Sequence, residues 1–187
     1  MRLPHHLLCY GPGALLLQWE QRISPDISTS VHAYALAIEQ HPAVLECVVA
    51  YASLLVRFST PSITAYQLKE YILDLQPSPV SDRSSILHEI PVCYDGPDFT
   101  TVAATLKLSA AALIALHTRE TYLVYQLGYQ PGFAFMGQTP ADLAIPRRSS
   151  PRARVPAGSV GLAGRQTGIY PTNSPGGWQL IGRCPIP

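Results

Sequence analysis

The chain has 187 residues, of which 47% are hydrophobic and 13% are charged, and its formal net charge is +1. This length suits one large or two small domains, and a charged share of half the usual ~25% indicates that much of the chain is buried or covered. So little net charge excludes the basic surface of a nucleic-acid-binding protein. No apolar run approaches the ~20 residues that cross a bilayer, and the start lacks a signal-peptide pattern, so we expect a cytoplasmic protein without a membrane partner.

Cysteines and short motifs indicate no familiar metal or nucleotide site. Cys9, Cys47, Cys93 and Cys184 are scattered, with no C-x-x-C pair and no histidine at zinc spacing. We therefore expect reduced thiols, no disulfide framework and no metal ligand set. The chain also lacks a G-x-x-x-x-G-K-[ST] phosphate loop, a G-x-G-x-x-G turn and an H-E-x-x-H helix. Any bound nucleotide must be held by other means.

Strand-like and helix-like patterns alternate along the first half of the chain. Apolar runs predict strands at 14–19, 44–51, 54–58 and 86–93. Apolar residues at spacings of three and four predict a helix at 28–40, with Ser28 or Thr29 as its N-cap. Thr64 and Gln67 have the spacing of a capping box, which opens a second helix.

The resulting order, β-α-β-β-α-β, is that of a ferredoxin-like unit. A connector rich in proline and serine at 77–82 ends this unit. We therefore predict a ferredoxin-like domain at 1–82 and a second domain at 83–187. Alternatively, the strand at 86–93 begins the second domain.

The second half begins with helical patterns and continues with glycine and proline. We predict helices at 100–106 and 109–118, the second capped by Ser109, and a strand at 121–127. From 128 to 183, glycine and proline recur every few residues, with aromatic residues between them: Tyr129, Phe133, Phe135, Tyr170 and Trp178. This mixture indicates an ordered, loop-built cavity rather than a linker. Short strands and tight turns, including a hairpin at 164–168, predict a small β-barrel, so the fold class is α+β.

Five blocks of this region recur in the same order in one protein family. They are Gly128-Tyr-Gln-Pro-Gly-Phe-Ala-Phe, Ile145-Pro-Arg-Arg, Val155-Pro-Ala-Gly-Ser-Val, Gly168-Ile-Tyr-Pro, and Ser174-Pro-Gly-Gly-Trp with Ile181-Gly-Arg. With these blocks the chain resembles the allophanate hydrolase subunit 1 family. That family includes the B subunits of the bacterial ATP-dependent 5-oxoprolinases and the KipI-type inhibitors of a sporulation histidine kinase.

The resemblance implies a fold, a reaction and partners. The second domain would be a cyclophilin-like β-barrel. The chain would act with C-like and A-like subunits to open 5-oxo-L-proline to L-glutamate, with ATP used by the complex, and would be inactive alone. Two alternatives remain: a KipI-type inhibitor that binds a histidine kinase, and the carboxyltransferase half of a urea carboxylase or allophanate hydrolase system.

The family pattern also continues beyond the last block of this chain. Its members carry a tail with an L-x-x-P-G-D-x-V-x-F pattern, which is not found here. The resemblance implies that this tail supplies closing strands to the barrel. We therefore expect an open strand edge, which is an association site unless a partner covers it.

His117, Arg154 and Tyr170 are the predicted catalytic residues. His117 ends the second helix of its domain, where an imidazole either acts as a general acid or base or caps the last carbonyls. The family motif has a histidine at this position too. Guanidinium groups bind carboxylate or phosphate in a bidentate manner. Among four clustered arginines we favour Arg147 and Arg154 for this role, and we expect Arg148 and Arg152 to be ordinary surface residues.

The predicted substrate-binding residues are pocket-lining aromatics, polar side chains and glycines whose amides suit an anion. They are Gly132, Phe133, Arg147, Gly158, Ser159, Gln166, Gly176, Gly177, Trp178 and Arg183. Core packing is the alternative for Trp178, and a tight turn is the alternative for the glycines. Asp142 is the single carboxylate between residues 128 and 183, so the sequence predicts half of a shared site.

Overall fold

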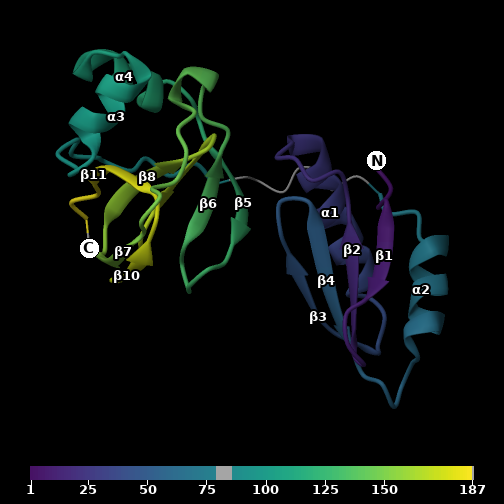
Figure 1. The fold of residues 1–187 in the computed structure, drawn as a ribbon. Helices are drawn as coiled ribbons and strands as arrows, with labels where there is room; N and C mark the ends of the chain where they lie inside the picture. Colours follow the sequence, from purple (N-terminus) through teal and green to yellow (C-terminus); the bar gives the residue numbers. More distant parts are fainter. Residues whose placement is uncertain (79–85, 187) are drawn as a thin grey trace. The chain divides into compact units, whose positions relative to one another are not determined.

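The computed structural model describes residues 1–78 and 86–186 (Figure 1). The fold is α+β with antiparallel sheets. The chain divides into two compact units, Met1–Ile86 and Leu87–Pro187, which we describe separately. The predicted domain boundary between residues 82 and 83 lies outside the described residues.

Four antiparallel strands and two helices form the first unit (Figure 1). The order of the strands in the sheet is β1-β2-β4-β3. The elements are β1 (His6–Cys9), β2 (Ala14–Gln18), α1 (Pro25–Ile38), β3 (Val44–Val49), β4 (Ser53–Phe58) and α2 (Ala65–Asp74). The two helices and the strands predicted at 14–19, 44–51 and 54–58 are therefore confirmed, apart from their ends.

The predicted order β-α-β-β-α-β is wrong in one place. Residues 86–92 contain no strand, and Cys93 forms an isolated bridge with Arg183 of the second unit. The fourth strand of the sheet is β1, which pairs with β2 along its whole length. The physical reason is proximity in sequence: a short turn containing Gly11, whose φ is 86°, joins the two strands, so their pairing closes a very short loop.

The starts of the two helices follow different rules. Thr64 and Gln67 form the predicted capping box, with Thr64 Oγ1 accepting from Gln67 N at 3.2 Å and Gln67 Oε1 accepting from Thr64 N at 3.0 Å. The prediction that Ser28 or Thr29 caps α1 is wrong, because the helix begins at Pro25. Proline at the first helical position has its φ preset and lacks the N–H that a cap would satisfy.

Both helices pack on one face of this sheet. Every second residue of β2 and β4 points into the core, as expected for strands with one covered face. The buried residues are Leu15, Leu17, Leu54, Val56 and Phe58 of the sheet, Ile27, Val31, Tyr34, Ala35 and Ile38 of α1, and Leu68 and Ile72 of α2. Burying each large aliphatic side chain contributes about 1.5–3 kcal/mol.

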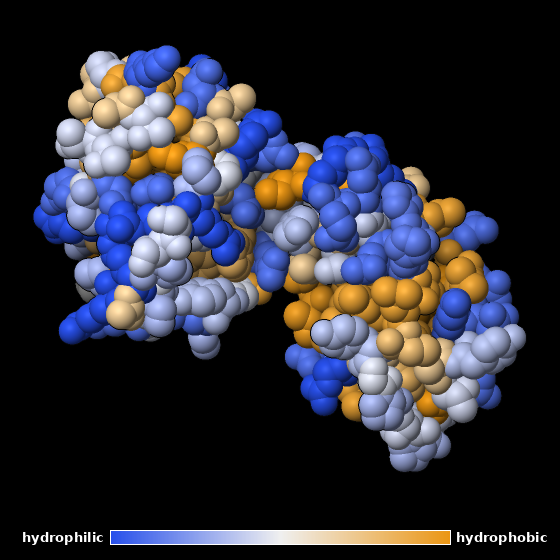
Figure 2. All heavy atoms as spheres, viewed as in Figure 1, coloured by the Kyte–Doolittle hydropathy of each residue, from blue (hydrophilic) through white to orange (hydrophobic). Residues whose placement is uncertain are grey.

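The other face of this sheet carries an apolar row. Leu8 lies opposite Leu16, Leu16 opposite Leu55, and Leu55 opposite Val48, so the row crosses all four strands. Leu8 and Val48, at its ends, are 46% and 43% exposed. Figure 2 shows the hydrophobic band that crosses the strands of this unit. The next residue of β4 on this face, Arg57, is paired with Glu46 at 2.8 Å.

The second unit contains a five-stranded sheet, a two-stranded sheet and a helical preface. The strand orders are β11-β8-β9-β6-β5 and β10-β7, all antiparallel. The elements are α3 (Phe99–Leu106), α4 (Ala110–Thr118), β5 (Leu123–Leu127), β6 (Ala134–Gly137), η1 (Ala141–Leu143), β7 (Arg152–Val155), β8 (Ser159–Ala163), β9 (Gln166–Ile169), β10 (Ser174–Gly176) and β11 (Gln179–Arg183). The two predicted helices, the Ser109 cap, the strand near 121–127 and the hairpin at 164–168 are confirmed.

Strand β8 lies between two hydrophobic clusters, and all five of its residues are buried. Val160 and Leu162 pack in the cluster beneath the helices, with Val102 and Leu113. Ala163 packs in an aromatic cluster on the other side. A strand covered on both faces is continuously apolar, which explains the run of residues from Val160.

A non-helical segment covers the outer edge of β11. Cys93 and Arg183 exchange two backbone hydrogen bonds of 2.8 Å, and the Gly96 and Asp98 amides donate to Ile181 and Leu180. A Cβ at Gly96 would overlap the backbone of β11, so only glycine permits this approach. The expected open edge is therefore not at β11, while β5 lies at the other edge with Leu127 65% exposed.

No single helix in the described part of the chain has the length and hydropathy of a membrane span. Helices α3 and α4 meet those criteria only when taken together, and they are bent by 93° relative to each other.

Candidate functional site

The predicted catalytic residues lie in three different surroundings of the second unit. Successive residues of β9 point to opposite faces of the sheet: Thr167 contacts His117 on the helical side, and Gly168 lies against the aromatic cluster that contains Tyr170. Arg154 is exposed on β7. The structure does not bring His117, Arg154 and Tyr170 together, so their joint catalytic role stays a prediction.

His117 is 6% exposed, and both of its ring nitrogens are hydrogen-bonded within the chain. Nδ1 lies 2.7 Å from the Tyr94 hydroxyl, and Nε2 lies 2.9 Å from Thr167 Oγ1. The Tyr122 hydroxyl donates to the backbone carbonyl of His117 at 2.8 Å. The ring therefore joins α4 to β9 and to residue 94, and the helix-cap interpretation of His117 is wrong.

The hydrogen-bond chain around His117 fixes its tautomer. Thr167 Oγ1 donates its one proton to the carbonyl of Gly161 at 3.2 Å. Thr167 must therefore accept from Nε2–H, which leaves Nδ1 to accept from the Tyr94 hydroxyl. Burial lowers the pKa of His117 to about 4, so the imidazole is neutral at pH 7. In this state it positions its neighbours and carries no charge.

Phe133 is the centre of the aromatic cluster and is 1% exposed. Its ring makes edge-to-face contacts with Tyr129, Phe135, Tyr170 and Trp178, at centroid distances of 4.8–5.7 Å. Such pairs stabilise a core by about 0.5–1.5 kcal/mol each beyond burial. Phe133 and Trp178, predicted to bind substrate, thus lie in a packed core, although Trp178 was also expected to be a core residue.

The Tyr170 hydroxyl is the polar end of this cluster. It lies close to Gly176, where any Cβ would be 2.5 Å from the phenolic oxygen, so Gly176 makes room for Tyr170. Burial raises the pKa of Tyr170, and a backbone hydrogen bond from Trp178 and the charges of Arg147 and Arg152 oppose this rise. The hydroxyl therefore keeps its proton at pH 7 and is able to donate it to an acceptor.

Asp98 organises two of the four clustered arginines. Its Oδ1 accepts from Arg152 Nη2 at 2.6 Å and from Arg148 Nη1 at 3.0 Å, and its Oδ2 accepts from the Leu180 amide at 2.7 Å. The expectation that Arg148 and Arg152 are ordinary surface residues is therefore wrong. Arg147 and Arg154, which were favoured from the sequence, are exposed.

Asp98 stays ionised although its side chain is 7% exposed. Burial by itself raises the pKa of this carboxyl. Hydrogen bonds from Arg152 and the Leu180 amide, and the charges of Arg152 and Arg148, bring the pKa below its usual range. One carboxylate thus faces two guanidinium groups, and the cluster keeps a net positive charge.

The other predicted binding residues are dispersed over the second unit. Gly132 and Gly158 have φ values of 83° and 79° and shape turns. Arg183 forms an exposed ion pair with Asp95 at 2.9 Å. Ser159 is buried on β8, Gln166 is half-buried on the β8–β9 hairpin, and the Gly177 carbonyl accepts from the Arg148 amide at 2.7 Å.

Sequence reasoning missed Asp98, Tyr94 and Thr167. Asp98 directly precedes α3, a position typical of an N-cap, but its side chain makes no capping bond and turns to the arginines instead. Its partners are 50 and 54 positions away in the sequence, so no local pattern reveals them. Tyr94 and Thr167 carry no local sign of their role beyond being polar groups near apolar residues.

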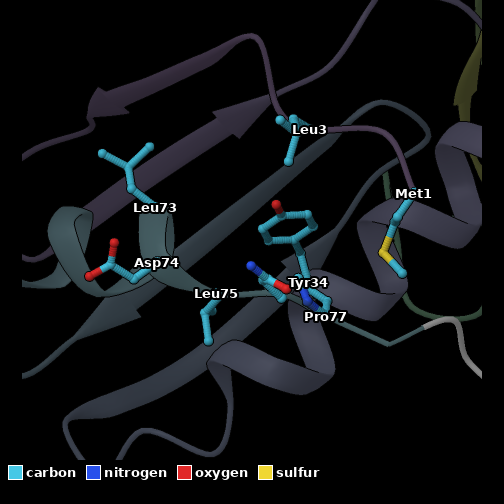
Figure 3. Close-up of a pocket in the computed structure, with 8 residues that line it drawn as sticks. Met1, Leu3, Tyr34, Leu73, Asp74, Leu75 and Pro77 are labelled. Carbon is cyan, nitrogen blue, oxygen red and sulfur yellow. The ribbon is translucent and has the colours of Figure 1, made fainter.

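A separate cavity of about 470 Å³ lies in the first unit (Figure 3). It is lined by Met1, Leu3, Tyr34, Leu73, Asp74, Leu75, Gln76 and Pro77. Figure 3 shows the Tyr34 hydroxyl pointing toward Leu3. The lining has one carboxylate and no arginine, lysine or histidine, and none of the predicted site residues lies there.

The chemistry available in the second unit is anion binding by arginine and tyrosine. Within the described ranges, no group of three histidine, cysteine, aspartate or glutamate side chains is placed to hold a metal ion. All four cysteines are free. Guanidinium and phenol groups bind carboxylates and phosphates well, but they do not by themselves cleave an amide bond.

Residues 5–187 match the carboxyltransferase domain family, subdomain C and D, and the chain belongs to this family. Within it, the chain is a homologue of the B subunits of 5-oxoprolinase. It is 37% identical to the 5-oxoprolinase B subunit from Bacillus subtilis strain 168, over 94% of this chain and 80% of the relative. It is 38% identical to that of Escherichia coli O157:H7, over 95% and 84%.

Solved structures show the same fold. The crystal structure of TTHA0988 superposes with a TM-score of 0.82 at 36% identity, over 92% of this chain. This chain spans 35% of the TTHA0988 chain, so that protein carries much more than the matched part. The urea amidolyase of K. lactis is 18% identical, with a TM-score of 0.67 over 92% of this chain and 12% of its own, and shares the fold.

Proposed function

We propose that this chain is the B subunit of an ATP-dependent 5-oxoprolinase, which opens 5-oxo-L-proline to L-glutamate while ATP is hydrolysed. The observation that carries the proposal is 37–38% identity to two 5-oxoprolinase B subunits, over at least 94% of this chain and 80% of theirs. Because ATP is a cytoplasmic nucleotide, the proposed complex works in the cytoplasm.

The proposal includes C-like and A-like partner subunits. The described residues offer positive and phenolic groups for an anion, but no group of three possible metal ligands. The sequence has no phosphate loop to hold ATP. A site with donors for the substrate and none of the remaining machinery is consistent with a shared active site, to which other subunits add the ATP-dependent groups.

Each unit has an antiparallel α+β arrangement that suits a more specific fold. We propose a ferredoxin-like domain at 1–82, in which β1 supplies the fourth strand, and a cyclophilin-like barrel at 83–187. The pairing of β1 with β2 supports the first assignment. Two antiparallel sheets with a strand covered on both faces support the second.

The test is 5-oxoproline-dependent release of ADP by the chain alone and by the complex copurified with its partner subunits. We expect activity in the complex and none in the single chain. Arg154 is exposed, so Arg154→Ala should leave the melting temperature unchanged and, if Arg154 contacts substrate, lower turnover about 10-fold or more. The matched control is Arg57→Ala, an exposed arginine of the first unit.

A carboxyltransferase role is the second candidate, because the matching family is described as a carboxyltransferase domain and the fold is that of a urea amidolyase. A stable complex that does not hydrolyse ATP in response to 5-oxoproline contradicts the main proposal. Carboxyl transfer to urea by the same complex, in the presence of a biotin carboxylase, would establish this second candidate.

A further inference from the structure

In the part of the chain that the structure describes, two buried hydrogen-bond donors without acceptors lie on the two-stranded sheet. Arg152 Nη1 and Ser174 Oγ are both buried and have no hydrogen-bond partner among the described residues. The Tyr170 hydroxyl, which accepts a backbone hydrogen bond from Trp178, adds a phenolic proton beside Gly176 of the same sheet. A buried donor left unpaired destabilises the fold, so proteins seldom leave two in one place without a ligand or water.

The backbone brings the three groups into one region. In the pairing of β10 with β7, Ser174 lies opposite Val155 and Gly176 lies opposite Arg152, with a bulge between the two pairs. The Tyr170 hydroxyl lies against Gly176, so it lies beside the strand position that faces Arg152. Tyr129 donates its hydroxyl to the Pro175 carbonyl and holds β10 in place between Ser174 and Gly176.

The charge of this region selects an anion over a neutral ligand. Asp98 is the one carboxylate that pairs with Arg148 and Arg152 in the described part of the chain, so the three groups together carry a charge of about +1 at neutral pH. Arg147 is close enough to influence the Tyr170 hydroxyl and adds a further positive charge. The unpaired donors need hydrogen-bond acceptors, and the positive charge favours a negative ligand. A group that only accepts hydrogen bonds and is negative at pH 7 meets both needs.

Asp98 is the positioning residue of this arrangement. It binds Arg152 through Nη2, and this leaves Nη1 of the same guanidinium fork without a partner among the described residues. The hydrogen bond between Asp98 Oδ2 and the Leu180 amide anchors the carboxylate to β11. Asp98, which is itself fixed to β11, therefore holds the Arg152 guanidinium in place with Nη1 unpaired in the described part of the chain.

We propose that Arg152, Ser174 and Tyr170 form a subsite for a carboxylate group. The identification of that group as the carboxylate of 5-oxoproline rests on the proposed function. A carboxylate has two oxygens and about four lone-pair positions, enough to accept from the guanidinium, the serine hydroxyl and the phenol together. In this proposal the three residues hold the substrate, and no step of ring opening is assigned to them.

The experiment compares the assembled complex carrying wild-type chain with the same complex carrying Ser174→Ala or Arg152→Met. Ser174 is the sharper variant, since its hydroxyl has no partner to lose among the described residues and its removal should not lower stability. Exposed residues of the same unit provide matched controls, Ser149→Ala and Arg119→Met. Steady-state kinetics give KM and kcat for 5-oxoproline. Ligand-observed NMR compares the binding of 5-oxoproline with that of pyrrolidinone, which lacks the carboxylate.

We expect KM for 5-oxoproline to rise about 3- to 10-fold in Ser174→Ala and about 10- to 100-fold in Arg152→Met, with kcat little changed. The preference for 5-oxoproline over pyrrolidinone should weaken in Ser174→Ala and be largely lost in Arg152→Met, and both controls should keep it. Thermal melting shows whether the Arg152→Met complex is folded. If it is not, the KM and the binding preference of Ser174→Ala alone test the subsite.

The other outcomes separate the subsite from the proposed function. A wild-type complex that turns over 5-oxoproline, with variants that keep the wild-type KM and binding preference, overturns the subsite and leaves the function standing. Binding of 5-oxoproline that the variants lose, without turnover by the wild type, supports the subsite and overturns the function. A wild-type complex that neither binds nor turns over 5-oxoproline overturns both.

Discussion

Arginine side chains that are close in sequence have different surroundings in this protein. Arg148 and Arg152 bind Asp98, whereas Arg147 and Arg154 are exposed. The sequence predicts a cluster of arginines in this region, because all four lie in the glycine- and proline-rich stretch. It does not predict which of them are held in place, because the carboxylate that selects them is in another part of the chain.

The neutral state of His117 predicts an acid-sensitive fold. Burial lowers its pKa to about 4, while an unfolded chain has a histidine pKa of about 6.5. Between these values the unfolded state binds the extra proton, so the free energy of unfolding should fall as pH drops from 6.5 to 4, by about 3 kcal/mol in all. Above pH 6.5 this contribution is fully present.

Urea unfolding at several pH values between about 7.5 and 4.5 measures this effect. His117→Gln keeps a hydrogen-bonding side chain but does not titrate, so its stability should be lower at the upper end of this range and less dependent on pH. A matched control is His41→Gln, since His41 is partly exposed on the first unit. Equal pH dependence in the wild type and His117→Gln would show that another group dominates.

Helices and strands were predicted where their cause is local. The capping box at Thr64, the Ser109 cap and the β8–β9 hairpin each depend on residues that are close in sequence, and all three are present. The prediction of a strand at 86–93 was wrong, because an apolar pattern does not indicate which strand a segment will pair with. The segment that begins at Cys93 pairs with β11, which lies at the far end of the sequence.

The contrast between the two helix starts in the first unit gives a test at this scale. Thr64→Ala removes the bond from the Gln67 amide to Thr64 Oγ1 and should lower the free energy of unfolding by about 1 kcal/mol. Ser24→Ala should change it by less than about 0.5 kcal/mol, because Ser24 makes no side-chain capping bond and Pro25 already presets the helix. Both values come from urea unfolding, and equal losses would contradict this account of capping.

At the scale of the whole molecule, the sequence predicted the α+β class and the half of the chain that carries the arginine cluster. The assembly of the candidate site depends on contacts between distant segments, such as His117 with Thr167 and Asp98 with Leu180. Pairs separated by 50 and 82 positions leave no periodic trace in one sequence. Related sequences share such contacts, but the similarity of their motifs does not show which distant residues touch.

The first unit should fold without the second. In the described part of the chain, the backbone partners of its strands lie between His5 and Phe58, and its core is formed mainly by residues of β2, β4, α1 and α2. A fragment of residues 1–86 should therefore show a cooperative thermal transition by circular dichroism. Leu17→Asp, which places a charge in this core, provides the unfolded reference, and a fragment that resembles it would contradict the prediction.

The covering of β11 by the segment that begins at Cys93 also sets an order of events during synthesis. Asp98 and Leu180 are 82 positions apart, and a ribosome adding ~5–20 residues per second needs roughly 4–16 s to pass from one to the other. During that interval the first unit has all of its strands, whereas Asp98 still lacks the amide that anchors it. A pause in translation before β11 would therefore prolong an unpaired state in the second unit alone.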